Sequence, residues 1–148
     1  IAYTQASVSR PAEVAVLRRG AAPARVTELG AVVPGLRDLG EVEELWLESS
    51  ADGRRVQAWL VKPPGFDASK KHPLILEIHG GPFADYGPKF AAEIQLYAAA
   101  GYVVLYVNPR GSTSYGEEFA NLIHHAYPGQ DYDDLMSAVD AAIATGYV

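Results

Sequence analysis

The sequence contains no cysteine. Disulfide bonds, zinc–thiolate sites and a cysteine nucleophile are therefore all excluded. An excess of basic residues is lacking too: 12 Lys and Arg face 18 Asp and Glu, and the net charge of −6 leaves no basic footprint for nucleic acid. No apolar run is long enough to predict a membrane span. The 148 residues are 49% hydrophobic, which is enough to bury the core of one ordinary domain.

The chain starts Ile-Ala-Tyr-Thr, with neither an initiator methionine nor a signal sequence. We therefore expect an internal piece of a longer protein, and the sequence indicates no compartment. The charge is uneven, since residues 72–148 carry nine acidic but only two basic side chains. An acidic solvated face explains this imbalance better than a preference for cationic substrates.

Two regions of different character meet at residue 40. Residues 1–40 predict short strands at Ile1–Ala6 and Glu13–Leu17 and a further short strand within 24–29. Residues 21–40 are rich in Ala, Gly and Pro, which is typical of a loop or linker. About 40 residues bury too little surface to fold alone.

Residues 41–148 predict an α/β domain. Glu41–Glu48 and Arg54–Val61 alternate in hydrophobicity around a turn at 50–53, which indicates a β-hairpin. Continuous apolar strands and helices then alternate at 74–79, 89–100, 102–107 and 131–145. Such strands are typically covered on both faces, and their alternation with helices favours parallel βαβ units.

The last predicted helix has the clearest boundary signals. We expect Asp131 to cap its N-terminus, with Asp133 and Asp134 in a first turn where the helix dipole favours anions. These aspartates are interpreted as capping and solvated residues rather than as a cation site. Gly146 stands where a glycine commonly ends a helix. The expected buried stripe consists of Leu135, Ala138, Val139, Ala142 and Ile143.

Glycine and polar residues end both apolar strands, as His79-Gly80-Gly81-Pro82 and as Asn108-Pro109-Arg110-Gly111. In open α/β sheets, ligands bind beyond the carboxyl ends of the parallel strands. Adjacent glycines let backbone N–H groups approach a ligand. An amide at Gly81 would stabilise the oxyanion of an acyl transfer by about 3 kcal/mol. A tight turn that needs a positive φ angle would explain the glycines equally well.

Other side chains near these motifs have simpler interpretations. We expect His79 to orient the glycine loop through a hydrogen bond rather than to act as a general base, because no convincing nucleophile stands near it. Ser112 and Ser114 lie outside a Gly-x-Ser-x-Gly elbow and are interpreted as turn serines. Arg110 is expected to anchor its loop by pairing with a carboxylate. The pair His124-His125 lacks a third ligand, so no metal site is predicted.

Four segments resemble the prolyl oligopeptidase family of serine peptidases, and most closely its acylaminoacyl-peptidase and dipeptidyl-peptidase-like branch. They are residues 59–66 (WLVKPPGF), 73–82 (PLILEIHGGP), 101–116 (GYVVLYVNPRGSTSYG) and 131–136 (DYDDLM). The resemblance implies that residues 41–148 form part of an α/β-hydrolase domain, with a doubly wound, mostly parallel sheet, and stop before the nucleophile elbow. It implies that residues 1–40 are the end of a β-propeller blade and a linker.

The same resemblance implies roles at the site. The second glycine of the His-Gly-Gly-Pro motif, Gly81, would offer its amide to the oxyanion. Five residues would shape the loop or support it from the neighbouring strand end: His79, Gly80, Pro82, Arg110 and Tyr115. Residues 126–129 depart from the family, whose members often have Trp-Gly before the Asp-Tyr motif, so the packing of this loop is expected to differ.

The catalytic Ser, Asp and His of the family would follow the helix that ends at Gly146. We therefore expect a second chain or a C-terminal remainder to carry them, and this chain alone to be inactive. The implied substrate is a small peptide, no cofactor is expected, and oligomerisation stays open. One alternative is a carboxylesterase-type hydrolase, although those commonly have a third glycine where Pro82 stands. The other is a non-catalytic fragment or binding module.

Overall fold

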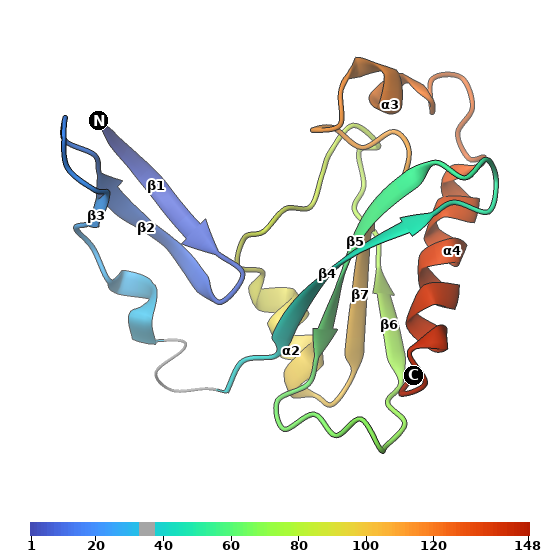
Figure 1. Cartoon of the computed structure of the whole chain (residues 1–148), viewed down its shortest axis with the longest axis horizontal. Coiled ribbons are helices and arrows are strands. Elements are labelled where there is room, and N and C mark those ends of the chain that lie inside the picture. The colour runs from blue at the N-terminus through green and yellow to red at the C-terminus, as the bar shows by residue number, and fades with distance from the viewer. Residues whose placement is uncertain (33–37) are drawn as a thin grey trace.

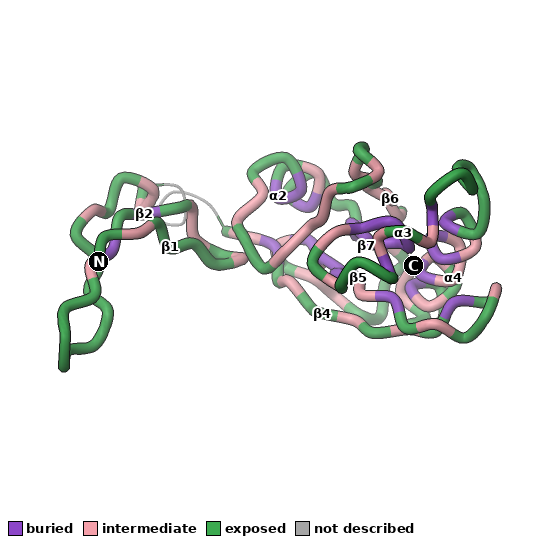
Figure 2. The backbone as a smooth tube through the Cα atoms, turned by 90° about the horizontal axis from the view of Figure 1, so that it is seen from above, coloured by how far each residue is buried: buried purple, intermediate pink, exposed green. Residues whose placement is uncertain are grey.

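The computed structural model describes residues 1–32 and 38–148. Residues 33–37, which belong to the expected linker, lie outside the described residues. Two separate sheets are formed, a three-stranded one near the N-terminus and a four-stranded one in the remainder (Figure 1). The buried residues concentrate around the four-stranded sheet, while the N-terminal part is mostly exposed (Figure 2).

The smaller sheet is antiparallel, with its strands in the order β1-β2-β3. Its elements are β1 (Ala2–Ser7), β2 (Arg10–Val16), β3 (Ala24–Arg25) and the following 3-10 helix η1 (Leu29–Ala31). The expected strands are confirmed, but β2 begins earlier than predicted because Arg10 already pairs with Ser7. Glu13 is buried here, and hydrogen bonds from Thr27 Oγ1 and the Gly30 amide lower the pKa of its carboxyl group.

The larger sheet has the strand order β4-β5-β7-β6. Its strands are β4 (Glu41–Glu48), β5 (Arg55–Lys62), β6 (Leu74–Glu77) and β7 (Val103–Asn108). The β4–β5 hairpin is confirmed, β5 and β7 are antiparallel, and β6 and β7 are parallel. All six residues of β7 are buried, because this strand has a neighbour on each side and a helix over each face.

Helices α2 (Ala92–Ala99) and α4 (Asp131–Ala144) cover opposite faces of this sheet (Figure 1). Alternate residues of β7 face the two helices. Val103, Leu105 and Val107 join the cluster beneath α4, whereas Val104 and Tyr106 join the cluster beneath α2. The unit β6-α2-β7 is the parallel βαβ unit that was predicted. A short helix, α3 (Glu117–Asn121), was not predicted.

Several predicted details of these elements were wrong. β6 ends at Glu77 and is only half-buried, because it lies at the edge of the described sheet, and Ile78 is 51% exposed. α2 begins at Ala92 rather than at residue 89. Gln130, not Asp131, occupies the N-cap position of α4, and Asp131 instead accepts a hydrogen bond from the Gly129 amide. Ile143 of the expected stripe is 52% exposed.

Within the described ranges, no helix combines the length and apolar character that a membrane span requires.

Candidate active site

The loops that follow β6 and β7 lie side by side, because these two strands are parallel neighbours and end at the same edge of the sheet. The first loop holds the His79-Gly80-Gly81-Pro82 motif. Gly81 has a φ angle of +136°, and a Cβ atom built on it would lie 2.8 Å from the Phe83 amide nitrogen. Only glycine fits this backbone without strain. Among the described residues, the Gly81 N–H donates no hydrogen bond.

Asn108, the last residue of β7, joins the two loops. Its side-chain oxygen accepts a hydrogen bond from the Tyr86 amide at 2.8 Å, and its side-chain nitrogen donates to the Tyr86 carbonyl at 2.9 Å. The Thr113 amide donates to the Ala84 carbonyl at 2.9 Å. Asn108 is fully buried, so these bonds are shielded from water. The glycine loop is therefore fixed at its far end by the neighbouring loop.

His79 contacts both loops through its ring nitrogens. Its Nδ1 lies 3.0 Å from the Gly80 carbonyl oxygen, and its Nε2 lies 3.0 Å from Ser112 Oγ. The ring also meets the Tyr86 ring edge to face, with the centroids 5.1 Å apart. Burial raises the pKa of Tyr86, so this phenol stays protonated at neutral pH. Ser112 lies at the end of a turn, as interpreted, and its amide donates to the Pro109 carbonyl at 3.0 Å. Its side chain is in addition only 1% exposed and contacts His79.

Arg110 anchors its loop by pairing with carboxylates, as expected. Its Nε and one terminal nitrogen donate to the two oxygens of Asp134 at 2.9 and 2.8 Å, and its own amide donates to Asp134 at 2.7 Å. Asp52, in the β4–β5 turn, accepts at 3.1 and 3.3 Å. The bonds to Asp134 raise the pKa of Arg110 further. Asp134 is fully buried, which corrects its interpretation as a solvated residue.

Tyr115 supports the site indirectly. Its hydroxyl accepts a hydrogen bond from the Asn108 side chain at 2.6 Å and donates to Gln57 of β5. Its ring meets the rings of Trp46 and Phe119. Burial raises the pKa of Tyr115, which keeps its proton available for Gln57. Tyr115 therefore contacts the glycine loop only indirectly, through Asn108.

A hollow of about 160 Å³ opens beside the glycine loop. Its walls include Ile78, the segment Gly80–Pro82, Pro109, Ile123 and Tyr127. Apolar residues form much of its wall, with the charged Arg110 and Asp131 beside them. A donor in an apolar setting stabilises an anion more strongly than one in water.

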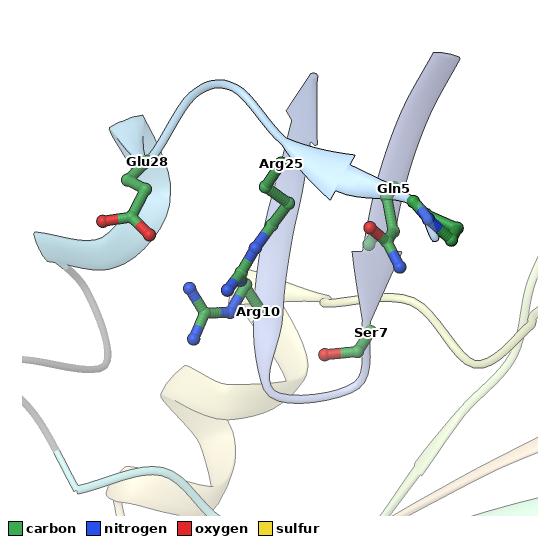
Figure 3. Close-up of a pocket in the computed structure, with 7 residues that line it drawn as sticks. Gln5, Ser7, Arg10, Arg25 and Glu28 are labelled. Carbon is green, nitrogen blue, oxygen red and sulfur yellow. The ribbon is translucent and has the colours of Figure 1, made fainter. Parts of the chain in front are cut away.

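A larger hollow, of about 480 Å³, lies on the three-stranded sheet (Figure 3). Arg10 and Arg25 extend into it from neighbouring strands, with Glu28 at its border. These side chains are at least partly exposed, and no nucleophile stands with a general base there. Size alone does not make a site, and the fixed glycine loop is the better candidate.

In the part of the chain that the structure describes, no group of three or more His, Asp or Glu residues is placed to hold a metal ion. The rings of His124 and His125 do lie together, with centroids 3.9 Å apart, but no acidic or further histidine ligand completes the pair.

Sequence reasoning missed three residues of this site: Asn108, Ser112 and Asp134. The position of Asn108 carried a usable signal, because a polar residue that ends a fully apolar central strand must have its hydrogen bonds satisfied. Asp134 carried one as well, since it lies one helical turn before Ala138, on the side of α4 that faces the sheet. Nothing local distinguishes Ser112, because its partner His79 is 33 residues away.

A sheet covered by helices on both faces, with a glycine loop beyond a parallel strand, defines a partial α/β-hydrolase domain. It is preceded here by the last strands of a β-propeller. A model of the prolyl oligopeptidase family matches residues 88–148, and the chain belongs to this family.

Similar proteins agree with this assignment. The chain is 50% identical over 95 residues to YuxL, an uncharacterized peptidase of Bacillus subtilis. This match covers 64% of the chain and 14% of that protein. It is 37% identical over 100 residues to dipeptidyl-peptidase 5 of Schizosaccharomyces pombe, and this match covers 66% of the chain and 14% of that protein. An acylaminoacyl peptidase of Pyrococcus horikoshii matches with a TM-score of 0.86 and 29% identity, over 97% of this chain and 23% of that one. The chain thus spans about a seventh of the length of these curated relatives.

Proposed function

We propose that this chain forms the oxyanion-binding side of a serine peptidase that hydrolyses short peptides. The observation that carries the proposal is the Gly81 amide, which has no acceptor among the described residues and stands in a loop fixed from the neighbouring strand end. A donor that is held in place before the reaction stabilises the transition state without reorganisation, and this makes it effective in catalysis.

The reaction follows the serine acyl-transfer scheme. A serine hydroxyl from a C-terminal remainder or second chain attacks the scissile carbonyl carbon, and a histidine from the same segment takes its proton. The carbonyl oxygen becomes an oxyanion that accepts a hydrogen bond from the Gly81 amide. The amine then leaves with the proton from that histidine, and water hydrolyses the acyl-enzyme in the same two stages.

His79 is not the base in this scheme. Both of its ring nitrogens already have partners within the chain, Gly80 O and Ser112 Oγ. Ser112, in turn, is too deeply buried to reach a substrate. We therefore place the nucleophile and the base outside residues 1–148.

The substrate class rests on the names of similar proteins, which are a dipeptidyl-peptidase and an acylaminoacyl peptidase. We propose cleavage near the N-terminus of short peptides, of the acylaminoacyl or the dipeptidyl and aminopeptidase type. In this proposal, residues 1–40 are the end of a propeller blade with its linker. Residues 41–148 are the N-terminal part of the catalytic domain, and the nucleophile elbow lies beyond them.

A fluorophosphonate probe, which labels activated serines, tests this proposal by intact-mass spectrometry. The full-length gene product, or a polypeptide that co-purifies with this chain, is expected to gain one adduct at a serine outside residues 1–148. The isolated 148-residue chain is expected to gain none. An adduct on Ser112, or no adduct in any sample, would contradict the proposal.

Two matched substrates then separate a peptidase from an esterase. An acylated dipeptide amide and the ester of the same acyl group are given to the full-length protein, and kcat/KM is measured for both. A peptidase turns over the amide at a rate well above background, whereas hydrolysis of the ester alone would favour a carboxylesterase-type enzyme.

A further inference from the structure

Three groups beside the candidate oxyanion donor are connected by two hydrogen bonds. Ser112 Oγ lies 3.0 Å from His79 Nε2, and His79 Nδ1 lies 3.0 Å from the carbonyl oxygen of Gly80. The serine belongs to the loop after β7, and the other two groups belong to the loop after β6. This series of hydrogen bonds therefore starts in one loop and ends on the backbone of the other.

The direction of each hydrogen bond follows from the chemistry of the groups. A carbonyl oxygen can only accept, so Nδ1 of His79 must carry the proton that binds Gly80. In a neutral imidazole the other nitrogen, Nε2, is then an acceptor, and the Ser112 hydroxyl donates to it. The Gly80 carbonyl thus selects the His79 tautomer, and the Ser112 hydroxyl completes the arrangement by donating to Nε2, which holds the ring in place.

The Gly80 carbonyl and the Gly81 N–H are the two ends of a single peptide group. Because that group is planar and trans, its C=O and N–H point in opposite directions, and fixing the oxygen fixes the direction of the N–H. A hydrogen bond accepted by the carbonyl also polarises the same amide and makes its N–H a stronger donor. Neighbouring glycines would otherwise leave this peptide group free to rotate.

We propose that His79 and Ser112 are positioning residues that aim the Gly81 amide at the oxyanion. This inference rests on the proposed function, because it assigns the pair a task only if Gly81 is the oxyanion donor. It differs from a general-base role, since neither side chain exchanges a proton with the substrate.

The surroundings keep this chain of hydrogen bonds rigid. Ser112 is 1% exposed, and its amide donates to the Pro109 carbonyl at 3.0 Å. The His79 ring rests against Tyr86, whose backbone is held on both sides by Asn108. A side chain that is packed and hydrogen-bonded in this way holds its neighbour to the accuracy that catalysis needs.

The competing explanation is that His79 merely ties the two loops together through Ser112. Two substitutions separate these roles, because each retains one of the two hydrogen bonds. In His79→Asn, the amide nitrogen takes the place of Nδ1 and can still donate to the Gly80 carbonyl. In His79→Gln, the longer amide takes the place of Nε2 and can reach Ser112 but not Gly80.

We expect the full-length His79→Asn variant to keep kcat for a peptide amide within about tenfold of the unmodified protein, with KM nearly unchanged. His79→Gln is expected to lose about 100-fold in kcat, as does removal of an oxyanion donor, again with little change in KM. The opposite order, with Gln more active than Asn, would show that the link to Ser112 matters for structure alone and would overturn the proposal.

Ser112→Ala and Ser114→Ala form a matched pair of serine substitutions. Ser114 is exposed and is expected to tolerate alanine without a change in kcat. Ser112→Ala is expected to lower kcat about tenfold, because the His79 ring loses one of the two hydrogen bonds that hold it. Equal kcat values for the two variants would contradict the positioning role of Ser112.

The tautomer itself can be measured without any substrate. Protein labelled with ¹⁵N-histidine is expected to show His79 in the Nδ1–H form, with the signal assigned by its loss in His79→Asn. A dominant Nε2–H form would overturn the proposal even in an active enzyme. If the tautomer is as expected but the full-length protein labels with no fluorophosphonate, the proposed peptidase function has failed instead.

Discussion

At the scale of single residues, Gly81 occupies a position in the candidate site that only glycine can take. Its positive φ angle and the 2.8 Å approach of a built Cβ to the Phe83 amide leave no room for a side chain. Gly87, six residues later, shows no heavy atom within 4 Å of a built Cβ. The two glycines therefore offer a matched pair of substitutions.

Gly81→Ala is expected to lower kcat/KM of the full-length protein by more than about 100-fold, because the strained loop turns the amide away from the oxyanion. Gly87→Ala is expected to change kcat/KM less than about threefold, since surface substitutions away from special features have small effects. Initial rates on one peptide amide provide the comparison. Similar rates for both variants would remove Gly81 from the mechanism.

The buried Arg110–Asp134 pair makes a second prediction at this scale. Asp134→Ala is expected to reduce the free energy of unfolding by about 3–5 kcal/mol, because the guanidinium is left buried without its main partner. Arg110→Lys should not preserve stability, since an ammonium group cannot make the paired bonds to both carboxylate oxygens. Denaturant unfolding gives both values.

Replacing both partners by apolar residues is the control for this pair. The double variant Arg110→Met with Asp134→Leu is expected to lose less stability than Asp134→Ala alone, because no buried charge is left over. If the double variant is less stable than Asp134→Ala, this expectation is contradicted. The pair would then contribute more to stability than the mutual compensation of its two charges.

At the scale of elements, the two loops beyond β6 and β7 behave as one unit because Asn108 links them. Asn108→Leu keeps the branched shape of the side chain but leaves the Tyr86 amide and carbonyl unsatisfied, each at a cost of about 1–3 kcal/mol. The exposed Asn121, at the end of α3, provides the control Asn121→Leu. We expect a clear fall in the thermal midpoint for the first variant only, accompanied by a loss of activity. Equal midpoints would mean that water replaces the lost bonds.

The β4–β5 turn is linked to the loop after β7 through Asp52. Hydrogen bonds from the Arg54 amide and then from Arg110 lower the pKa of Asp52 below its ordinary value of 3.8. A depressed carboxyl pKa stabilises the fold above the unfolded value, and this stabilisation is lost as the pH falls through the folded value.

Asp52→Asn is therefore expected to lower the thermal midpoint at pH 7, and the gap to the unmodified protein should narrow as the pH falls below about 4. Midpoints measured from pH 7 to pH 3 test this. A gap that stays constant over the whole range would show that the charge of Asp52 does not contribute.

The sequence predicted best those elements whose boundaries depend on neighbouring residues alone. The hairpin and β7 were predicted to within a residue or so, because a turn signal and a continuous apolar run each determine a strand. The start of α2 and the cap of α4 were misplaced, since helix ends depend on local contacts that residue type alone does not determine, such as the bond from the Gly129 amide to Asp131.

Some residues of the candidate site could likewise be predicted from the sequence, and others could not. The glycine motif and the anchoring role of Arg110 were predicted, because glycine and arginine have few explanations at strand ends. The contribution of Ser112 could not be predicted, since it depends on His79, which the fold brings beside it from 33 residues away. The functional roles of His79, Gly80, Gly81, Pro82 and Tyr115 stay predictions until activity is measured.

At the scale of the whole molecule, the chain belongs to a peptidase family yet spans about a seventh of its curated relatives. An oxyanion donor accelerates acyl transfer only where a nucleophile attacks beside it. The function proposed for Gly81 is therefore a property of the assembled protein, and it requires a serine placed close to the glycine loop.

The most direct measurement is a crystal structure of the full-length protein after reaction with a fluorophosphonate, whose phosphonyl oxygen stands for the oxyanion. We predict this oxygen at about 2.7–3.1 Å from the Gly81 amide nitrogen, with the Gly80 carbonyl still bound to His79. An adduct whose oxygen faces other donors, with Gly81 turned away, would contradict the role given to this loop.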